Sequence, residues 1–251
     1  MKNPSSKAQA ERETIFHTLL DSDLPPSEKS EARLIDEGIV LIGAGSHTTA
    51  WTLTVSTFHI LSNPTILRNL KEEFHANKKS GENLTLQQLE KLPYLTAVIK
   101  EGLRLAYGVS VRLPRSAPDT ALRFKDWVIP KGTPVSMSAV LQHENEVVFP
   151  EPRSFKPERW LEDKLGKLDR YLVSFNAGSR ICLGINLAWT ELYLCLSAIF
   201  DTFGGKEYRG ENDKGVLELF ETGLGDVEIK ADVFFPVVEE GSKGVRVMIR
   251  S

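Results

Sequence analysis

Apolar positions recur at helical spacing through the first hundred residues of the chain, and prolines interrupt the pattern. The spacing predicts helices over residues 7–20, 28–61, 64–76 and 93–105, with a short helical turn near residues 85–89. Ser27 and Asn63 precede the second and third helices, where their side chains can accept hydrogen bonds from free backbone amides. Residues 38–44 of the second helix are apolar on every side, which is typical of a helix that crosses the middle of a protein.

Beyond Gly108 the helical period gives way to short apolar runs separated by proline and glycine. We expect strands at 109–113, 122–124, 127–129 and 135–137, and then an ordered but irregular loop at 149–173. Residues 183–200 predict a buried helix, and the last apolar runs predict a hairpin, with strands at 233–238 and 245–249. The whole pattern indicates a mainly α fold with small β-sheets, of the α+β class.

One decapeptide, Phe-Asn-Ala-Gly-Ser-Arg-Ile-Cys-Leu-Gly at residues 175–184, combines a cysteine with two glycines. A thiolate that holds iron axially needs a tight turn with room for a flat macrocycle, and glycine permits such a turn. The decapeptide therefore predicts a haem-thiolate loop, whereas a single cysteine is ordinarily interpreted as a small buried hydrophobe. Five positions that occur together favour the haem-thiolate loop: Phe175, Gly178, Arg180, Cys182 and Gly184.

Charge and cysteine content narrow the expected function. The formal net charge is −3, from 31 basic and 34 acidic residues, so nucleic acid is not an expected partner. Two cysteines, Cys182 and Cys195, are too few for a disulfide framework, and a reducing compartment is expected, with Cys195 as an inert core thiol. The first ten residues lack the apolar stretch of a signal peptide or membrane anchor, and no segment predicts a membrane span.

The decapeptide resembles the cysteine-ligand signature of the cytochrome P450 superfamily, and all five signature positions match. The resemblance implies a haem-thiolate monooxygenase that inserts one oxygen atom from O2 into an apolar small molecule. It also implies haem b (iron protoporphyrin IX) as cofactor, Cys182 as axial iron ligand, and an NADPH-dependent reductase as electron donor. Arg180 is expected to reach a haem propionate, and Phe175 to limit water near the sulfur.

A second group of residues is expected to form a buried clamp behind the haem. Glu101 and Arg104 leave the same face of a helix, and such a pair in isolation is usually a solvated surface ion pair. Residues 155–160, Phe-Lys-Pro-Glu-Arg-Trp, match a superfamily element whose arginine, here Arg159, joins the pair. A carboxylate between two guanidinium groups would hold the irregular loop against the helix. We interpret the role of the clamp as assembly, not chemistry.

The resemblance also indicates contacts with the haem propionates. Arg115 is the first choice and Arg112 the second, because a planar guanidinium suits a carboxylate better than a lysine does. The alternative is that one or both arginines simply face solvent, as most arginines do.

Residues 43–49, Gly-Ala-Gly-Ser-His-Thr-Thr, resemble the oxygen-activating stretch of the superfamily. His47 stands where relatives usually have an acid, and Thr48 occupies the hydroxyl position. Thr48 is expected to hydrogen-bond to dioxygen, and His47 to relay protons. The two glycines of this stretch predict either a local distortion of the helix or close packing against a neighbour.

Members of the superfamily are about twice as long as this chain, which resembles their C-terminal half: a single partial domain over residues 1–251 without the N-terminal anchor and first helices. In eukaryotes that anchor typically holds the enzyme to the endoplasmic reticulum, so we expect the cytoplasmic side for this chain. Residues 24–27 and 112–115 are most similar to fungal members of secondary-metabolite biosynthesis. Two alternatives stay open: an inactive fragment or half of a split enzyme, and a haem-dependent isomerase, suggested by His47, that inserts no oxygen.

Overall fold

The structure is a computed structural model that describes residues 14–78 and 82–251. The chain divides into two compact units, residues 1–47 and 48–251. The boundary lies inside one continuous helix, α2 (Glu31–Ser62), so a single element belongs to both units. The expectation of one partial domain therefore stays a prediction.

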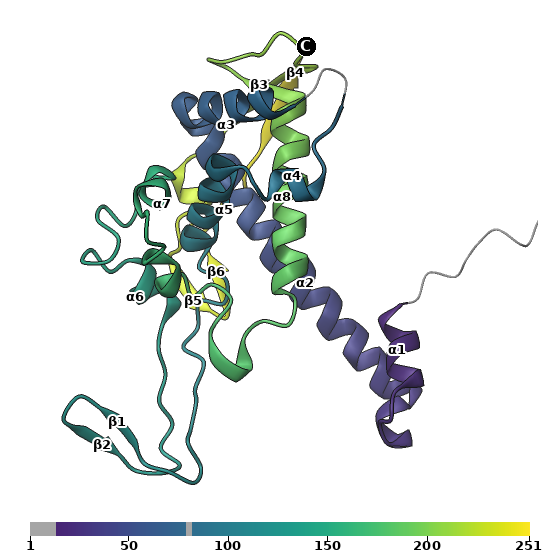
Figure 1. The fold of residues 1–251 in the computed structure, drawn as a ribbon, viewed down its shortest axis with the longest axis vertical. Helices are drawn as coiled ribbons and strands as arrows, with labels where there is room; N and C mark the ends of the chain where they lie inside the picture. The colour runs from purple at the N-terminus through teal and green to yellow at the C-terminus, as the bar shows by residue number, and fades with distance from the viewer. Residues whose placement is uncertain (1–13, 79–81) are drawn as a thin grey trace, which may run out of the picture. The chain divides into compact units, whose positions relative to one another are not determined.

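The described part of the first unit contains α1 (Ile15–Asp21), a 3₁₀ helix (Pro26–Lys29) and the beginning of α2 (Figure 1). The predicted first helix began at residue 7, and its residues 7–13 lie outside the described residues. Ser27 does not cap the long helix, because it lies within the 3₁₀ helix. Ser30 precedes α2 instead, and its Oγ accepts a hydrogen bond from the amide of Arg33 at 3.4 Å.

The apolar stretch of α2 is exposed, which makes the prediction of a buried crossing wrong for residues 38–44. Ile39, Val40 and Ile42 are 65%, 61% and 71% exposed. The buried positions of α2 begin only at Thr49 and continue to Ile60. A helix that is apolar on every side is buried only where other segments of the protein pack around it. The sequence pattern of the helix does not show whether such segments are present.

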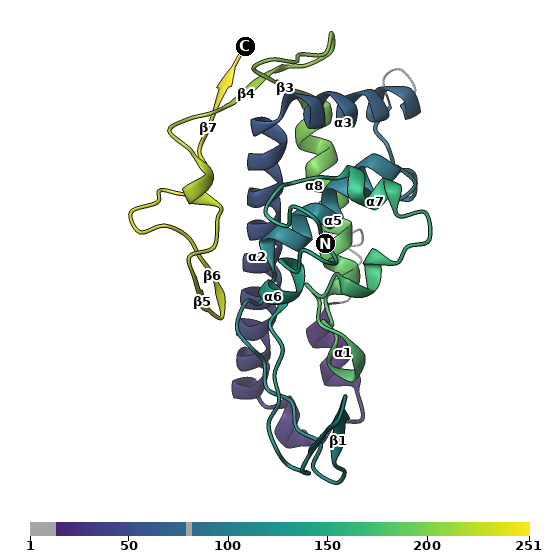
Figure 2. The same ribbon diagram turned by 90° about the vertical axis from the view of Figure 1, so that its left-hand side faces the viewer.

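The second unit is built from helices that pack around a common core (Figures 1 and 2). Besides the end of α2, these are α3 (Pro64–Asn77), α4 (Leu86–Leu89), α5 (Pro93–Ala106) and α8 (Ile185–Thr202). Fully buried apolar side chains of this core come from α2, α3, α5 and α8, and they include Ile60, Leu70, Leu95, Ile99, Leu196 and Phe200. Each such side chain contributes about 1.5–3 kcal/mol by leaving water.

Local chemistry fixes several helix ends where the sequence predicted them. The Asn63 side chain caps α3 by accepting from the amides of Thr65 and Ile66, as expected. At the start of α5, the carboxylate of Glu73 on α3 accepts from the amides of Tyr94 and Leu95 at 2.7 and 2.8 Å. A side chain from a neighbouring helix thus satisfies amides that α5 leaves free.

Within residues 14–78 and 82–251 the strands form three small sheets, and only part of the predicted set of strands is present there. Strand β1 (Leu122–Phe124) pairs antiparallel with β2 (Trp127–Ile129), as predicted. Residues 109–113 and 135–137 are not strands, and an isolated bridge between Arg115 and Val135 is the pairing found there. Figures 1 and 2 show β1 and β2 at the tip of a long excursion away from the helices of this unit.

The predicted C-terminal hairpin is wrong in its pairing. Strand β5 (Ala231–Val233) pairs with β6 (Phe235–Val237), whereas β7 (Val247–Arg250) pairs with β4 (Gly215–Leu219). Strand β3 (Phe203–Gly205) completes that second sheet by a parallel pairing with β4. Adjacent apolar runs suggest a hairpin, but tertiary contacts decide which strands meet.

Two further expectations need correction. The loop predicted at 149–173 contains a helix, α7 (Glu158–Glu162), and a 3₁₀ helix (Leu168–Tyr171), and it is preceded by α6 (Ala139–His143). The predicted buried helix is α8, but it buries only one face, since Leu187 and Leu194 are 58% and 43% exposed. The fold class, mainly α with small sheets, is confirmed. None of the helices in the described ranges is both long and apolar enough to cross a membrane.

Candidate functional site

The cysteine loop is a closed turn that leads directly into α8. The amide of Cys182 donates to the carbonyl of Phe175 at 2.9 Å, and this hydrogen bond closes the loop at its base. Gly178 has φ +74°, a left-handed conformation that favours glycine, and it begins a 3₁₀ turn that ends at Arg180. Gly184 caps α8 and lies beside the thiol, because a Cβ added to it would lie 3.9 Å from Cys182 Sγ.

The thiol of Cys182 is exposed and free, whereas that of Cys195, within α8, is half-buried. Phe175 packs on the core and against Trp189, with ring centroids 6.5 Å apart. The loop is therefore anchored by an aromatic side chain at one end while its cysteine stays accessible.

The segment that enters the loop is held by α5 and the turn that follows it. Ser174 Oγ donates to the carbonyl of Leu103 at 2.8 Å. Gly108, with φ +69°, lies so close that an added Cβ would be 2.6 Å from the carbonyl oxygen of Ser174. The amide of Val173 donates to Nε2 of His143 at 2.9 Å. These contacts place the base of the loop against the end of α5.

The predicted clamp residues meet in the interior. Glu101 and Arg104 are 0% exposed and form a two-bonded ion pair: Nε donates to Oε2 at 2.9 Å and Nη2 to Oε1 at 2.7 Å. Arg159 Nε donates to Oε1 of the same carboxylate at 3.0 Å. The structure thus brings α5 and α7 together through one carboxylate between two guanidinium groups. The role of the clamp in assembly stays a prediction.

All five N–H groups of Arg104 have acceptors. Besides the two bonds to Glu101, Nη1 donates to the carbonyls of His143 and Pro152, and Nη2 to the carbonyl of Ser154. The guanidinium carbon also lies 5.2 Å from the ring centroid of Phe149. A buried arginine whose donors are all paired fixes the path of the chain between α6 and α7.

The carboxylate of Glu101 is ionised despite its burial. Burial by itself raises its pKa, but the hydrogen bonds and charge of Arg104, with the charge of Arg159, outweigh that effect and hold the pKa below its usual value. The amide of Lys156 and the indole N–H of Trp160 add two more hydrogen bonds, each 2.9 Å long. The negative charge is therefore fully compensated inside the protein.

Two residues of this support were missed in the sequence. Trp160 is the last residue of the matching element at 155–160, and its indole N–H donates a hydrogen bond to Glu101. His143 belongs to no motif in the sequence, yet it ends α6, is 0% exposed and contacts the segment before the cysteine loop. No local pattern marks these contacts, because the partners lie 59 and 30 residues away.

The arginines expected at the propionates remain on the surface. Arg112, Arg115 and Arg180 are all exposed, and none of them forms an ion pair with a carboxylate of residues 14–78 and 82–251. Arg115 donates a hydrogen bond from Nη1 to the carbonyl of Pro114 at 3.0 Å. The role of the three arginines in binding propionates stays a prediction.

The predicted oxygen-activating stretch lies in α2. His47 is exposed and Thr48 is half-buried, and the carbonyl of Thr48 accepts a hydrogen bond from Thr52 Oγ1 at 3.0 Å. The helix is continuous through Gly43 and Gly45. An added Cβ on either glycine would meet no atom of the described residues within 4 Å. The expected reasons for these glycines, a local distortion or close packing, stay predictions. The roles of His47 and Thr48 stay predictions.

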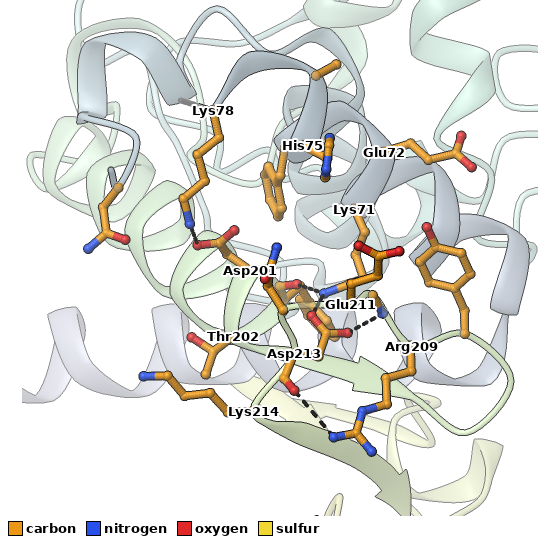
Figure 3. Close-up of a pocket in the computed structure, with 17 residues that line it drawn as sticks. Lys71, Glu72, His75, Lys78, Asp201, Thr202, Arg209, Glu211, Asp213 and Lys214 are labelled. Atoms are coloured by element: carbon orange, nitrogen blue, oxygen red, sulfur yellow. Dashed lines mark hydrogen bonds and ion pairs between the residues drawn. The ribbon is translucent and has the colours of Figure 1, made fainter. Parts of the chain in front are cut away.

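A cavity of about 830 Å³ lies at the other end of α8 and is separate from the cysteine loop (Figure 3). The buried ion pair between Lys71 and Asp213, 2.6 Å long, and the pair between Lys78 and Asp201 occupy its walls. Because α8 has 18 residues at about 1.5 Å each, Asp201 is on the order of 25 Å from the start of the helix. The cavity therefore does not contribute to the cysteine site.

The residues of the cysteine loop fit the needs of a haem group. An exposed free thiol can serve as an axial ligand, and exposed guanidinium groups such as that of Arg180 suit propionate carboxylates. The closed loop presents the sulfur on a turn supported from behind by α5. This combination meets the requirements of a haem-thiolate protein.

Comparison with known proteins identifies the family. The family model described as cytochrome P450 matches residues 2–230. The cytochrome P450 monooxygenase tpcC of Cochliobolus heterostrophus is 49% identical over 95% of this chain and 46% of its own length. The cytochrome P450 monooxygenase astB of Talaromyces wortmannii is 46% identical over 98% of this chain and 52% of its own length. The fusicoccadiene C-8 hydroxylase of Alternaria brassicicola is 42% identical over 94% of this chain and 44% of its own length.

The chain belongs to the cytochrome P450 family. The family resemblance inferred from the cysteine loop is therefore confirmed. The chain spans about half the length of the curated relatives it matches.

Proposed function

We propose that the protein to which this chain belongs is a haem-thiolate monooxygenase. It would insert one oxygen atom from O2 into an apolar small molecule, with electrons from an NADPH-dependent reductase. The observation that carries the proposal is the exposed thiol of Cys182 on a loop whose entry is hydrogen-bonded to α5 and α6. Family membership and the names of the fungal relatives support the same activity.

Haem b would supply the iron-centred activation of dioxygen that oxygen insertion requires. Cys182 Sγ would be its axial ligand, and the loop's backbone would hold that sulfur at a fixed position. Arg180, Arg115 and Arg112 would bind the propionates through their guanidinium groups. Phe175, which packs against the core beside the loop, would exclude water near the sulfur.

Proton delivery is proposed for the residues of α2. The Thr48 hydroxyl would donate a hydrogen bond on the oxygen-binding side, and the His47 imidazole would pass protons to it from solvent, to which it is exposed. A haem-dependent isomerisation is the alternative suggested by histidine at this position. Oxygen-18 labelled O2 separates the two, because product without the label would contradict insertion.

The substrate class proposed is an apolar secondary metabolite of a fungus. The support is the set of relatives, which are fungal monooxygenases and include one named as a hydroxylase of fusicoccadiene. We further propose the cytoplasmic side of the endoplasmic reticulum as its location, on family resemblance alone.

The test is haem reconstitution followed by the carbon monoxide difference spectrum of the reduced protein. We expect a thiolate-type band in the wild type and in Cys195→Ala, and its loss in Cys182→Ala. A band that persists in Cys182→Ala would overturn the ligand assignment. If the 251-residue chain takes up no haem while a chain of its relatives' full length does, the result favours an inactive fragment or a half that needs a second polypeptide.

A further inference from the structure

His143 connects the buried clamp to the cysteine loop. Its ring lies between Tyr107 and Phe149, stacked on the first at 6.1 Å and edge-on to the second at 6.3 Å. Its Nδ1 is 2.9 Å from the carbonyl oxygen of Arg104, and its Nε2 accepts from the amide of Val173 at 2.9 Å. The ring thus bridges the backbone of α5 and the chain two residues before Phe175.

The two hydrogen bonds define the protonation state of the ring. A carbonyl oxygen can only accept a hydrogen bond, so Nδ1 must carry the hydrogen atom that it donates to the backbone carbonyl of Arg104. A backbone amide can only donate, so Nε2 must present a lone pair to Val173. His143 is therefore neutral and fixed in the Nδ1–H tautomer, and an imidazolium could not accept from Val173.

The backbone of His143 completes the connection. Its carbonyl accepts from Arg104 Nη1 at 2.9 Å while its ring donates to the Arg104 carbonyl, so the two residues exchange hydrogen bonds in both directions. Arg104 in turn holds Glu101. A continuous set of buried hydrogen bonds runs from the clamp carboxylate through Arg104 and His143 to Val173. Along it, the donor and the acceptor of each hydrogen bond are determined.

We propose that His143 is a positioning residue for Cys182: its Nε2 lone pair fixes the entry of the cysteine loop and thereby the direction in which the sulfur is presented. The proposal rests on the proposed haem-thiolate function for its purpose, but the positioning itself concerns the protein without haem. It differs from mere packing because it requires an acceptor at Nε2 and not simply an aromatic ring.

The charged and titratable groups around the ring favour its neutral form. Burial and the charge of Arg104 on α5 together lower the pKa of His143 to about 4, against the opposing effects of the hydrogen bond to the Arg104 carbonyl and of the Glu101 charge. Tyr107 stacks on the ring, and its hydroxyl donates to Glu144 at 2.7 Å, next to the histidine in the chain. The acceptor at Nε2 therefore persists through the physiological range of pH.

Two substitutions at His143 distinguish the role of Nε2 as acceptor from the role of Nδ1–H as donor. In His143→Gln the amide oxygen can take the place of Nε2 and accept from Val173, whereas in His143→Asn the shorter amide can replace only Nδ1–H toward Arg104. Amide hydrogen exchange over residues 173–182 of the haem-free protein is the measurement. We expect exchange to be roughly 10-fold faster in His143→Asn and close to the wild type in His143→Gln, since a lost buried hydrogen bond has about that effect.

The matched control is the exposed histidine His75 on α3, where both the Gln and the Asn substitution should leave the loop unchanged. Equal loosening in both His143 variants, or unchanged exchange in His143→Asn, would overturn the proposal. A measurement on the wild type covers the case in which the variants do not fold. Its imidazole nitrogen NMR spectrum at pH 7 should show the Nδ1–H tautomer of His143, and an imidazolium or an Nε2–H form would contradict the proposal.

The result is independent of the proposed function. If Cys182→Ala retained a thiolate-type spectrum, the ligand assignment would fail while the exchange data on His143 would still stand. If the exchange data failed, Cys182 could still be the ligand, and only its positioning by His143 would be wrong.

Discussion

Trp160 donates its indole N–H to Oε2 of Glu101 across 2.9 Å, and both side chains are buried. The contact joins α7 to α5 and adds a neutral donor to a carboxylate that two arginines already bind. Together with the amide of Lys156, it leaves the carboxylate surrounded by donors on all sides. Such a group is costly to alter, because each partner depends on the charge at the centre.

Glu101→Gln is expected to lower the free energy of unfolding by about 3–5 kcal/mol, because it leaves Arg104 and Arg159 without their counter-charge. The measurement is urea unfolding followed by circular dichroism. Glu218→Gln is the matched control, since Glu218 pairs with Arg250 on the surface and its loss should cost less than about 1 kcal/mol. Equal effects of the two substitutions would contradict a buried, charge-dependent clamp.

Trp160→Phe is expected to cost about 1.5–3 kcal/mol for the lost hydrogen bond to a charged acceptor, with a further contribution from the smaller ring. The same change at Trp127, which is 73% exposed, should alter stability by less than about 0.5 kcal/mol. Chemical unfolding of both variants tests the pair. A cost at Trp160 no larger than at Trp127 would mean that the indole N–H does not support the clamp.

The sequence could predict those features that depend on neighbouring residues. Asn63 followed by Pro64 marks the start of α3, and Pro93 marks the start of α5, because capping and proline chemistry act within one turn. The residues of the clamp were also predictable, since Glu101 and Arg104 share a helix face and Arg159 lies in a matching element. The family resemblance supplied the identity of the clamp residues, because spacing alone favours a surface ion pair, whereas the geometry of the bonds required the fold.

Features that depend on distant partners were missed for the same physical reason. The partner of β7 is β4, about thirty residues earlier, and nothing in the apolar run at 245–249 distinguishes that strand from a nearer one. His143 contacts Val173 through a ring nitrogen, and a histidine at the end of a short helix carries no local mark of such a partner. The apolar residues at the beginning of α2, such as Ile42, were predicted to be buried from composition alone. They are exposed, because burial too depends on distant partners.

Gly108→Ala is expected to destabilise the protein more than Gly132→Ala. Both glycines have positive φ, +69° and +76°, so both substitutions carry a backbone cost of about 1 kcal/mol. Only at Gly108 would the added Cβ lie 2.6 Å from the carbonyl oxygen of Ser174, and at Gly132 it would meet no described atom within 4 Å. Thermal unfolding compares the two, and equal losses would show that the turn after α5 does not press on the cysteine-loop entry.

Stability is expected to fall as the pH drops from about 7 toward 5, because His59 and His143 are held neutral in the folded protein. Burial lowers the pKa of each to about 4, whereas both take up protons near pH 6.5 when the chain is unfolded. Their contribution is therefore complete above pH 6.5 and decreases as the pH falls toward 4. The loss by pH 5 is about 2 kcal/mol for each of the two groups.

Urea unfolding at several pH values between 7.5 and 5 measures this dependence. His143→Gln and His59→Gln should each flatten the curve, because each removes one group that gains a proton on unfolding, and His75→Gln should leave the slope unchanged. Measurements above pH 5 keep the Glu101 carboxylate out of the window, since its pKa lies below its usual value and its contribution is lost only at lower pH. An unchanged slope in both His143→Gln and His59→Gln would mean that neither ring is neutral in the folded state, and the hydrogen bond from Val173 to His143 would then have no acceptor.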